Sequence, residues 1–194
     1  GGLHRPVGAA QWVFVPPTTA DPLGLEPAWQ AIDDTIFAQP PEPRSVRTLF
    51  DLLGAPPYGV TEGIMPVLLC AFLLAHRDVV TLYSEGTLLP EPAIADWEVL
   101  LRRPELFAVA GSRVVGHRAE VVGRLARGLG TVPAALPVVR DLIRRLKTLP
   151  DHVWRTTHLS PTTLAVRQAV DGARSPETLL FHDLPVALGL NPFT

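Results

Sequence analysis

The sequence predicts a mostly helical α+β protein in which a winged-helix-like unit is followed by a helical bundle. Apolar residues recur at helical spacing in most of the longer segments, whereas β-type residues are confined to short runs. No period of 20–50 residues repeats, which argues against a solenoid. With 194 residues, 47% of them apolar and 19% charged, the chain has the length and composition to bury a substantial core.

Residues 1–44 are expected to form an N-terminal strand, a helix and a proline-rich connector. The run 11–15 is of β type and is ended by Pro16 and Pro17. Large apolar residues at helical spacing, among them Trp29 and Ile32, predict a helix over 26–38. The prolines that follow this helix predict a stiff connector.

Residues 45–110 carry the pattern of a winged-helix-like unit. Ser45 is a typical N-cap and Gly54 a typical C-terminal residue for a first helix. After a proline-containing turn, a second helix is expected over 61–76, apolar nearly all round and therefore central to the core. Two short β-type runs around 84–86 then predict a hairpin.

The remainder of this unit and the whole of 111–194 are expected to be mainly helical. A helix at 94–101 and a strand at 106–110 complete the winged-helix-like unit. Further helices are expected at 114–128, 134–148, 161–172 and 176–188. The last two start at a serine followed by a proline, which favours a capped helix.

The motifs that would indicate catalysis are missing from the sequence. It contains no phosphate-binding loop, and its glycines do not form a dinucleotide fingerprint. The six histidines are dispersed without metal-ligand spacing, and no cysteine or serine stands in a recognisable nucleophile motif. Asp33 and Asp34 are adjacent on a predicted helix and point about 100° apart. We therefore expect no catalytic, cofactor-binding or metal-binding residue, and no enzymatic activity.

The charge is divided unevenly along the chain. Residues 1–98 carry 4 basic and 12 acidic side chains, and residues 99–194 carry 13 and 7. The helix at 134–148 has an apolar stripe and a separate basic face. The candidate binding residues are Arg118, Arg124, Arg127, Arg140, Arg144, Arg145, Lys147 and Arg155.

Three roles stay open for this basic face: pairing with the acidic half of the chain, binding an acidic protein partner, or tracking the phosphates of a nucleic acid. The winged-helix-like unit itself argues against reading a DNA duplex. Its helix at 61–76 is apolar with only Arg77 at its end, and the turn of the hairpin carries Glu85. If the unit is a winged helix, we expect that helix to pack against protein.

The location expected from the sequence is the cytoplasm. The single cysteine, Cys70, lies in an apolar run and cannot form an internal disulfide, which fits a reducing compartment. That run is too short to cross a bilayer and no signal peptide is recognisable, so no membrane is expected. The start at Gly1 without methionine predicts that this chain is a piece of a larger protein.

Two stretches carry a resemblance to a known family. One is Leu53-Gly54-Ala55-Pro56-Pro57-Tyr58-Gly59-Val60-Thr61-Glu62-Gly63-Ile64-Met65-Pro66 with Arg77-Asp78-Val79-Val80-Thr81-Leu82-Tyr83-Ser84-Glu85-Gly86-Thr87. The other runs from Leu149-Pro150-Asp151-His152 to Leu179-Leu180-Phe181-His182-Asp183-Leu184-Pro185. They resemble a region downstream of the ATPase core in large bacterial P-loop ATPases of anti-phage systems of the BREX kind.

The resemblance implies a cytoplasmic accessory module in a multiprotein assembly and carries over no catalytic residue, because the ATPase motifs are absent from this chain. We therefore expect a non-catalytic interaction module that binds a protein partner or the rest of a larger parent chain. The alternative is a nucleic-acid-binding winged-helix domain that uses the basic helix face.

Overall fold

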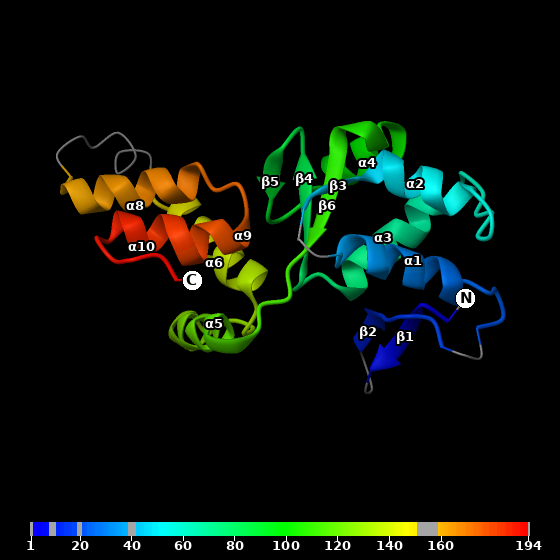
Figure 1. Cartoon of the computed structure of the whole chain (residues 1–194), viewed down its shortest axis with the longest axis horizontal. Coiled ribbons are helices and arrows are strands. Elements are labelled where there is room, and N and C mark those ends of the chain that lie inside the picture. The colour runs from blue at the N-terminus through cyan, green and yellow to red at the C-terminus, as the bar shows by residue number, and fades with distance from the viewer. Residues whose placement is uncertain (1, 8–10, 19–20, 39–41, 151–158, 194) are drawn as a thin grey trace. The chain divides into compact units, whose positions relative to one another are not determined.

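The computed structural model describes the chain except residues 1, 8–10, 19–20, 39–41, 151–158 and 194. It divides the chain into two compact units, 1–111 and 112–194, which are described separately (Figure 1). In the described residues the protein is mostly helical with two small antiparallel sheets, which confirms the predicted fold class.

The first unit starts with a small hairpin. Strand β1 (His4–Val7) pairs antiparallel with β2 (Gln11–Phe14), which lies against helix α3. The sequence predicted β2 but not β1. Helix α1 (Glu26–Ile36) follows, with Pro27 in its first turn, where a missing backbone N–H costs nothing.

Helices α2 (Val46–Gly54) and α3 (Met65–Ala75) are the two helices predicted on either side of the proline-containing turn. The Ser45 side chain accepts a hydrogen bond from the backbone N–H of Arg47, which satisfies one free donor of the first turn of α2. Helix α3 begins four residues later than predicted. The reason is a tight turn at its start, in which the N–H groups of Ile64 and Met65 both donate to the carbonyl of Thr61.

The predicted hairpin at 79–89 is confirmed. Strand β4 (Val80–Ser84) pairs antiparallel with β5 (Thr87–Leu89) around a turn in which Glu85 and Gly86 have φ of 49° and 79°. Two successive positive φ values are those of a type I′ turn, whose twist matches that of the flanking strands.

Two further strands extend this sheet to the order β3-β6-β4-β5. Helix α4 (Ile94–Arg102) and a short 3-10 turn (Pro104–Leu106) lead into β6 (Phe107–Gly111), the strand predicted at 106–110. Strand β6 pairs with β4 on one side and with the two-residue β3 (Arg44–Ser45) on the other. The sequence did not predict β3.

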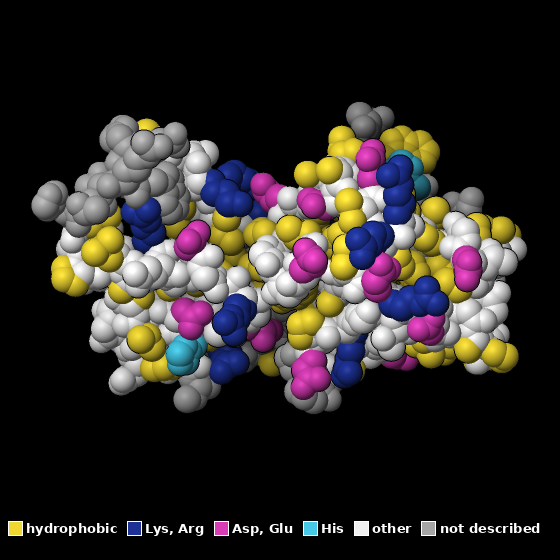
Figure 2. All heavy atoms as spheres, turned by 90° about the horizontal axis from the view of Figure 1, so that it is seen from above, with side chains coloured by type: hydrophobic (Ala, Val, Ile, Leu, Met, Phe, Trp, Pro, Cys, Tyr) yellow, Lys and Arg dark blue, Asp and Glu magenta, His cyan; other side chains and the backbone are white. Residues whose placement is uncertain are grey.

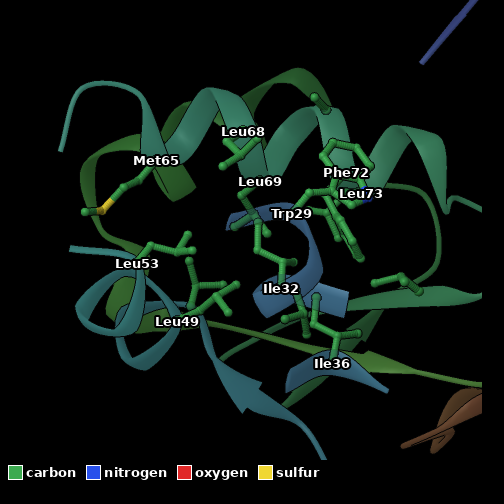
Figure 3. Close-up of a cluster of buried hydrophobic side chains, with 14 of the residues drawn as sticks. Trp29, Ile32, Ile36, Leu49, Leu53, Met65, Leu68, Leu69, Phe72 and Leu73 are labelled. Carbon is green, nitrogen blue, oxygen red and sulfur yellow. The ribbon is translucent and has the colours of Figure 1, made fainter. Parts of the chain in front are cut away.

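The core of the first unit lies between three helices and one face of the sheet (Figure 3). In Figure 3 the buried side chains of α3 point toward those of α1 and α2. The labelled residues are Trp29, Ile32, Ile36, Leu49, Leu53, Met65, Leu68, Leu69, Phe72 and Leu73. Because α1 supplies part of this core, the boundary expected at residue 44 does not separate two packed units, whereas the boundary expected at 110 agrees with the division to within one residue.

The second unit is helical. It contains α5 (Gly116–Leu129), α6 (Ala135–Lys147) and α8 (Pro161–Asp171), close to the predicted ranges. Gly130, with φ 73°, ends α5. The last helical segment runs through α9 (Pro176–Thr178), a π-helical stretch (Leu179–Asp183) and α10 (Leu184–Ala187).

The apolar interior of the second unit draws on each of its longer helices. Val122 of α5, Val139 of α6, Val170 of α8 and Phe181 of the π-helical stretch are buried. None of the described helices is long and apolar enough to span a membrane.

Candidate interaction surfaces

Arg118, predicted to belong to a basic binding face, is placed by the structure in an internal contact of the second unit. Its Nη2 donates a hydrogen bond of 3.0 Å to the carbonyl of Phe193, and its guanidinium lies 5.1 Å from the centre of the Phe181 ring. The ring of Phe193 also meets that of Phe181 edge-on, with centroids 6.5 Å apart. Arg118 therefore holds the C-terminal segment against the helices.

The arginines of α6 share an acidic partner on their own helix. Nε of Arg145 lies 2.7 Å from Oδ2 of Asp141, and Nη1 of Arg144 lies 3.7 Å from Oδ1 of the same carboxylate. Arg145 also donates a hydrogen bond of 3.0 Å to the carbonyl of Leu129, one of the last carbonyls of α5. These contacts satisfy a helix C-terminus and offset part of the positive charge.

The remaining residues of the predicted basic face differ in their exposure and in the contacts that they already make. Arg140 is half-buried and has an interaction partner, and Arg127 donates to the carbonyl of Gly123 in its own helix. Arg124 and Lys147 are exposed, and neither forms a hydrogen bond or ion pair within the described parts of the chain.

The predicted binding residue Arg155 lies outside the described residues. On the face shown in Figure 2, Lys and Arg side chains are interspersed with Asp and Glu side chains. The structure thus brings the predicted arginines of α5 and α6 into one unit, but it uses several of them in contacts within that unit.

A different surface stands out in the first unit: the outer face of α3. Ile64, Val67 and Leu74 are 49%, 63% and 43% exposed, and Cys70 between them is half-buried. The spacing of Val67, Cys70 and Leu74, three and four residues apart, places them on the side of α3 opposite the buried Phe72, and Ile64 stands just before the helix begins. We call these four residues the α3 face.

The expectation that the helix at 61–76 is central to the core is confirmed by the buried residues of α3, but one side of the helix is exposed. A helix that is apolar all round gives no periodicity from which its buried side can be predicted. Only one side of α3 is buried because α1 and α2 pack against that side. The sequence pattern of the helix carries no information about this packing.

The N-terminal end of the α3 face borders a small pocket of mixed polarity. Ile64 lines a cavity of about 280 Å³ together with Leu23, Pro57 and Tyr58. Leu23 is itself largely exposed. The apolar surface therefore continues from the helix onto the loops that precede α1 and α3.

A broader groove of mixed polarity lies on another side of the first unit, where α2, the 55–64 loop and the end of α4 meet. Its volume is about 1080 Å³, and Phe50 and Met65 contribute apolar walls. Arg47 and Asp51, which line it too, form an exposed ion pair of 3.1 Å that neutralises both groups locally. The residues that line this groove include no His, Cys or Ser that could act as a base or nucleophile beside these two charges.

The titratable groups that could carry chemistry come together in pairs at most among the described His, Cys, Asp and Glu residues. His76 ends α3 with its Nε2 3.9 Å from the carboxylate of Asp33, and its ring lies 4.3 Å from that of Phe72. Among the described residues, no three His, Cys, Asp or Glu side chains come together as a metal site would require. Burial raises the pKa of the Cys70 thiol, which is the opposite of what an activated nucleophile needs.

The tryptophans differ in burial. Trp29 is buried, whereas Trp12 is 59% exposed on β2, with its ring 5.1 Å from that of His4. Trp154 lies outside the described residues.

Comparison with known proteins gives no further guide to function. No family model, no curated protein and no solved structure matches this chain.

Proposed function

We propose that this chain is a non-catalytic interaction module that binds a protein partner through the α3 face and serves the assembly of a larger bacterial ATPase. The observation that carries the proposal is the exposed apolar side of α3. Water-exposed large apolar side chains at helical spacing gain free energy when another apolar surface covers them.

The place of α3 in the fold supports a protein partner over a nucleic acid. It is the second helix of a helix–turn–helix and is followed directly by a hairpin, the order of winged-helix units. In helix–turn–helix proteins that bind DNA, the second helix reads bases and needs Arg, Lys, Asn or Gln on its outer side. Here Val67 and Leu74 occupy that side, and Glu85 stands at the tip of the hairpin.

The ATPase setting rests on the resemblance of 53–66, 77–87 and the later stretches to accessory regions of anti-phage ATPases of the BREX kind. In that setting the module would act in the cytoplasm as part of a multiprotein complex. No residue of this chain is assigned a role in ATP hydrolysis.

The alternative function, nucleic-acid binding by the second unit, is favoured by one observation. Arg124 and Lys147 are exposed and without hydrogen-bond or ion-pair partners in the described residues, so both are available to phosphate groups. Against it stands the use of Arg118 and Arg145 in internal contacts.

A photoreactive amino acid at position 67 tests the proposal in cells that produce the protein together with its natural binding partners. We expect Val67 replaced in this way to give a discrete protein adduct on illumination, because contact with a partner buries this side chain. Position 94 is the matched control, since Ile94 is an apolar helical residue of the same unit and is 80% exposed. Adducts of equal yield at both positions, or an adduct with nucleic acid at 67, would contradict the proposal.

The alternative is tested with a mixed-sequence 30-base-pair duplex and the corresponding single strand at 50 mM salt, where phosphate contacts are strongest. We expect no binding of either probe at low micromolar protein. If binding is seen, falls with salt at a slope near −0.7 to −0.9 per neutralised phosphate, and is lost when Arg124 and Lys147 are replaced by Glu, the second unit is the functional one.

A further inference from the structure

We propose that the second unit contains a binding site for a peptide segment of a partner protein that carries an aromatic residue, and that Phe193 of this chain occupies the site in the structure. The walls of the site are His117 and Arg118 of α5 and Phe181 of the π-helical stretch. We call these three residues the Phe193 site. The α3 face belongs to the other unit, so this inference goes beyond the proposed function and does not rest on it.

Both backbone groups of Phe193 are bound. Its N–H donates a hydrogen bond of 2.8 Å to the carbonyl oxygen of Phe181, and its carbonyl oxygen accepts one of 3.0 Å from Nη2 of Arg118. Every residue except proline offers these two groups, so the two hydrogen bonds select a peptide backbone without selecting a sequence. Because helices and strands already pair their own backbone groups, a ligand must present this residue outside regular secondary structure.

The side chain of Phe193 supplies the selectivity. Its ring meets the Phe181 ring edge-on, with centroids 6.5 Å apart and an interplanar angle of 83°, and the centroid of the His117 ring lies 6.5 Å away. Edge-to-face contacts stabilise an aromatic side chain beyond the apolar area that it buries. The ligand class is therefore a peptide segment with an aromatic residue at the bound position.

The acceptor at Phe181 follows from the sequence of the last helical segment. In an α-helix the carbonyl of residue 181 would accept a hydrogen bond from the N–H of residue 185, and Pro185 has no N–H. The helix widens here to the π-helical stretch Leu179–Asp183, a form that recurs at functional sites. The carbonyl of Phe181 is therefore able to take a hydrogen bond from a segment outside the helix.

The walls of the site are held in place by contacts that do not involve Phe193. Phe181 is buried, and the guanidinium of Arg118 lies 5.1 Å from the centre of its ring. This cation–π contact orients Arg118 whether or not the site is filled. A site whose walls keep their places when it is empty binds a ligand with a small ordering cost.

The segment 188–193 is fastened mainly by Phe193. Gly189, with φ 72°, turns the chain back after α10, and residues 188–192 are all exposed. Phe193 is half-buried and is the residue of this segment that contacts the site. A segment of another protein that makes the same contacts can therefore displace it.

The test uses the full chain and a four-residue peptide, acetyl-Leu-Asn-Pro-Phe-amide, which copies residues 190–193. Phe193→Ala removes the side chain that fills the site. We expect this variant to bind the peptide with a Kd of roughly 0.1–1 mM, as a small ligand does. Wild type should bind it at least about tenfold more weakly, because only the fraction of molecules with an open site can bind. The titration is followed by the amide NMR signals of α5 and of 179–183.

Three controls test recognition by the named residues. In the Phe193→Ala chain, Arg118→Ala should weaken peptide binding roughly tenfold, because a hydrogen bond from a charged donor is lost. Arg124→Ala in the same chain should leave the affinity unchanged, since Arg124 is exposed on the same helix and lies outside the site. A peptide with Ala in place of Phe should not bind.

Wild type gives a second measurement that does not depend on the folding of a variant. Excess peptide should displace Phe193 and speed the hydrogen exchange of its amide, which donates to Phe181. The inference would be overturned by unchanged exchange of this amide at about 5 mM peptide, by equal affinity of the peptide for wild type and Phe193→Ala, or by equal binding of the Ala peptide. The photoreactive group at position 67 tests the α3 face separately, so either proposal can fail without the other.

Discussion

In the first unit, helix α3 carries exposed apolar side chains on one side and core side chains on the other. In the second unit, several basic side chains of α5 and α6 make contacts that hold that unit together. In the first unit, Val67 and Phe72 differ by five positions along α3, yet one is exposed and the other fully buried. In the second unit, Arg118 and Arg124 lie on the same helix, yet one holds the C-terminal segment and the other has no partner among the described residues.

The comparison shows that the sequence locates apolar and basic residues but does not show whether their side chains are exposed and able to bind a partner. The acidic first half of the chain offers an apolar surface, which the charge balance conceals. In the basic second half, Arg145 contacts Asp141 and the carbonyl of Leu129 at the end of α5, and Arg118 lies over the ring of Phe181. A search for binding sites by charge alone would select the second unit and would miss the exposed apolar side chains of α3.

The largest effect is expected from placing a carboxylate on the buried side of α3. Leu68→Asp or Phe72→Asp should unfold the first unit, because an unpaired buried charge costs several kcal/mol against a total stability of about 5–15 kcal/mol. Hydrogen exchange of the β4 and β6 amides, which pair with each other in the central sheet, reports this unfolding.

Val67→Asp is the matched control on the same helix. Its carboxylate stays in water, so the free energy of unfolding should change by no more than about 0.5 kcal/mol. Comparable protection in Leu68→Asp and Val67→Asp would mean that the two sides of α3 have been assigned the wrong way round.

Much of the first unit could be predicted from local patterns. The cap at Ser45, the prolines at 56 and 57 and the turn glycine at 86 each dictate a backbone conformation, and the helices and hairpin between them follow. The strands that were missed depend on distant partners. Strand β3 is two residues long and exists only because Arg44 pairs with Val109, far along the chain.

The candidate site was predicted less well, for a related reason. A side chain's exposure and its ion pairs are set by contacts between elements far apart in sequence, such as that between Arg118 and Phe193. The apolar character of α3 was evident from the sequence, but which of its sides is covered was not. Periodicity fails at a helix where every position is apolar.

A smaller loss of stability is expected when the side chain of Arg118 is removed. Arg118→Ala loses a charge-assisted hydrogen bond to Phe193 and the contact with the Phe181 ring, and should destabilise the docked C-terminal segment by about 1–3 kcal/mol. The backbone N–H of Phe193 donates to the carbonyl of Phe181 at 2.8 Å, so the loss of its protection from hydrogen exchange measures the release.

Arg124→Ala provides the comparison, since Arg124 is exposed on the same helix. It should leave the exchange rate of the Phe193 amide unchanged. Equal effects of the two substitutions would show that Arg118 acts through its general positive charge and not through its contacts, and the contrast between the two units would then be weaker than the structure indicates.

The smallest effect concerns Glu85, the hairpin residue that argued against duplex binding. Its φ of 49° is unfavourable for most side chains, and Asn adopts this conformation more readily. Glu85→Asn should therefore stabilise the first unit by about 0.3–1 kcal/mol, seen as a higher denaturant midpoint with an unchanged slope. The backbone bond from the Glu85 N–H to the carbonyl of Leu106, at 2.8 Å, does not involve the side chain and is kept.

Two further substitutions at Glu85 separate backbone conformation from charge. Glu85→Asp keeps the charge and also tolerates positive φ, so it should be stabilising, whereas Glu85→Gln removes the charge without this tolerance and should have no effect. If Gln stabilises as much as Asn, the carboxylate itself is unfavourable at the tip of the hairpin. The charge of the side chain, and not the backbone conformation at this position, would then explain its cost.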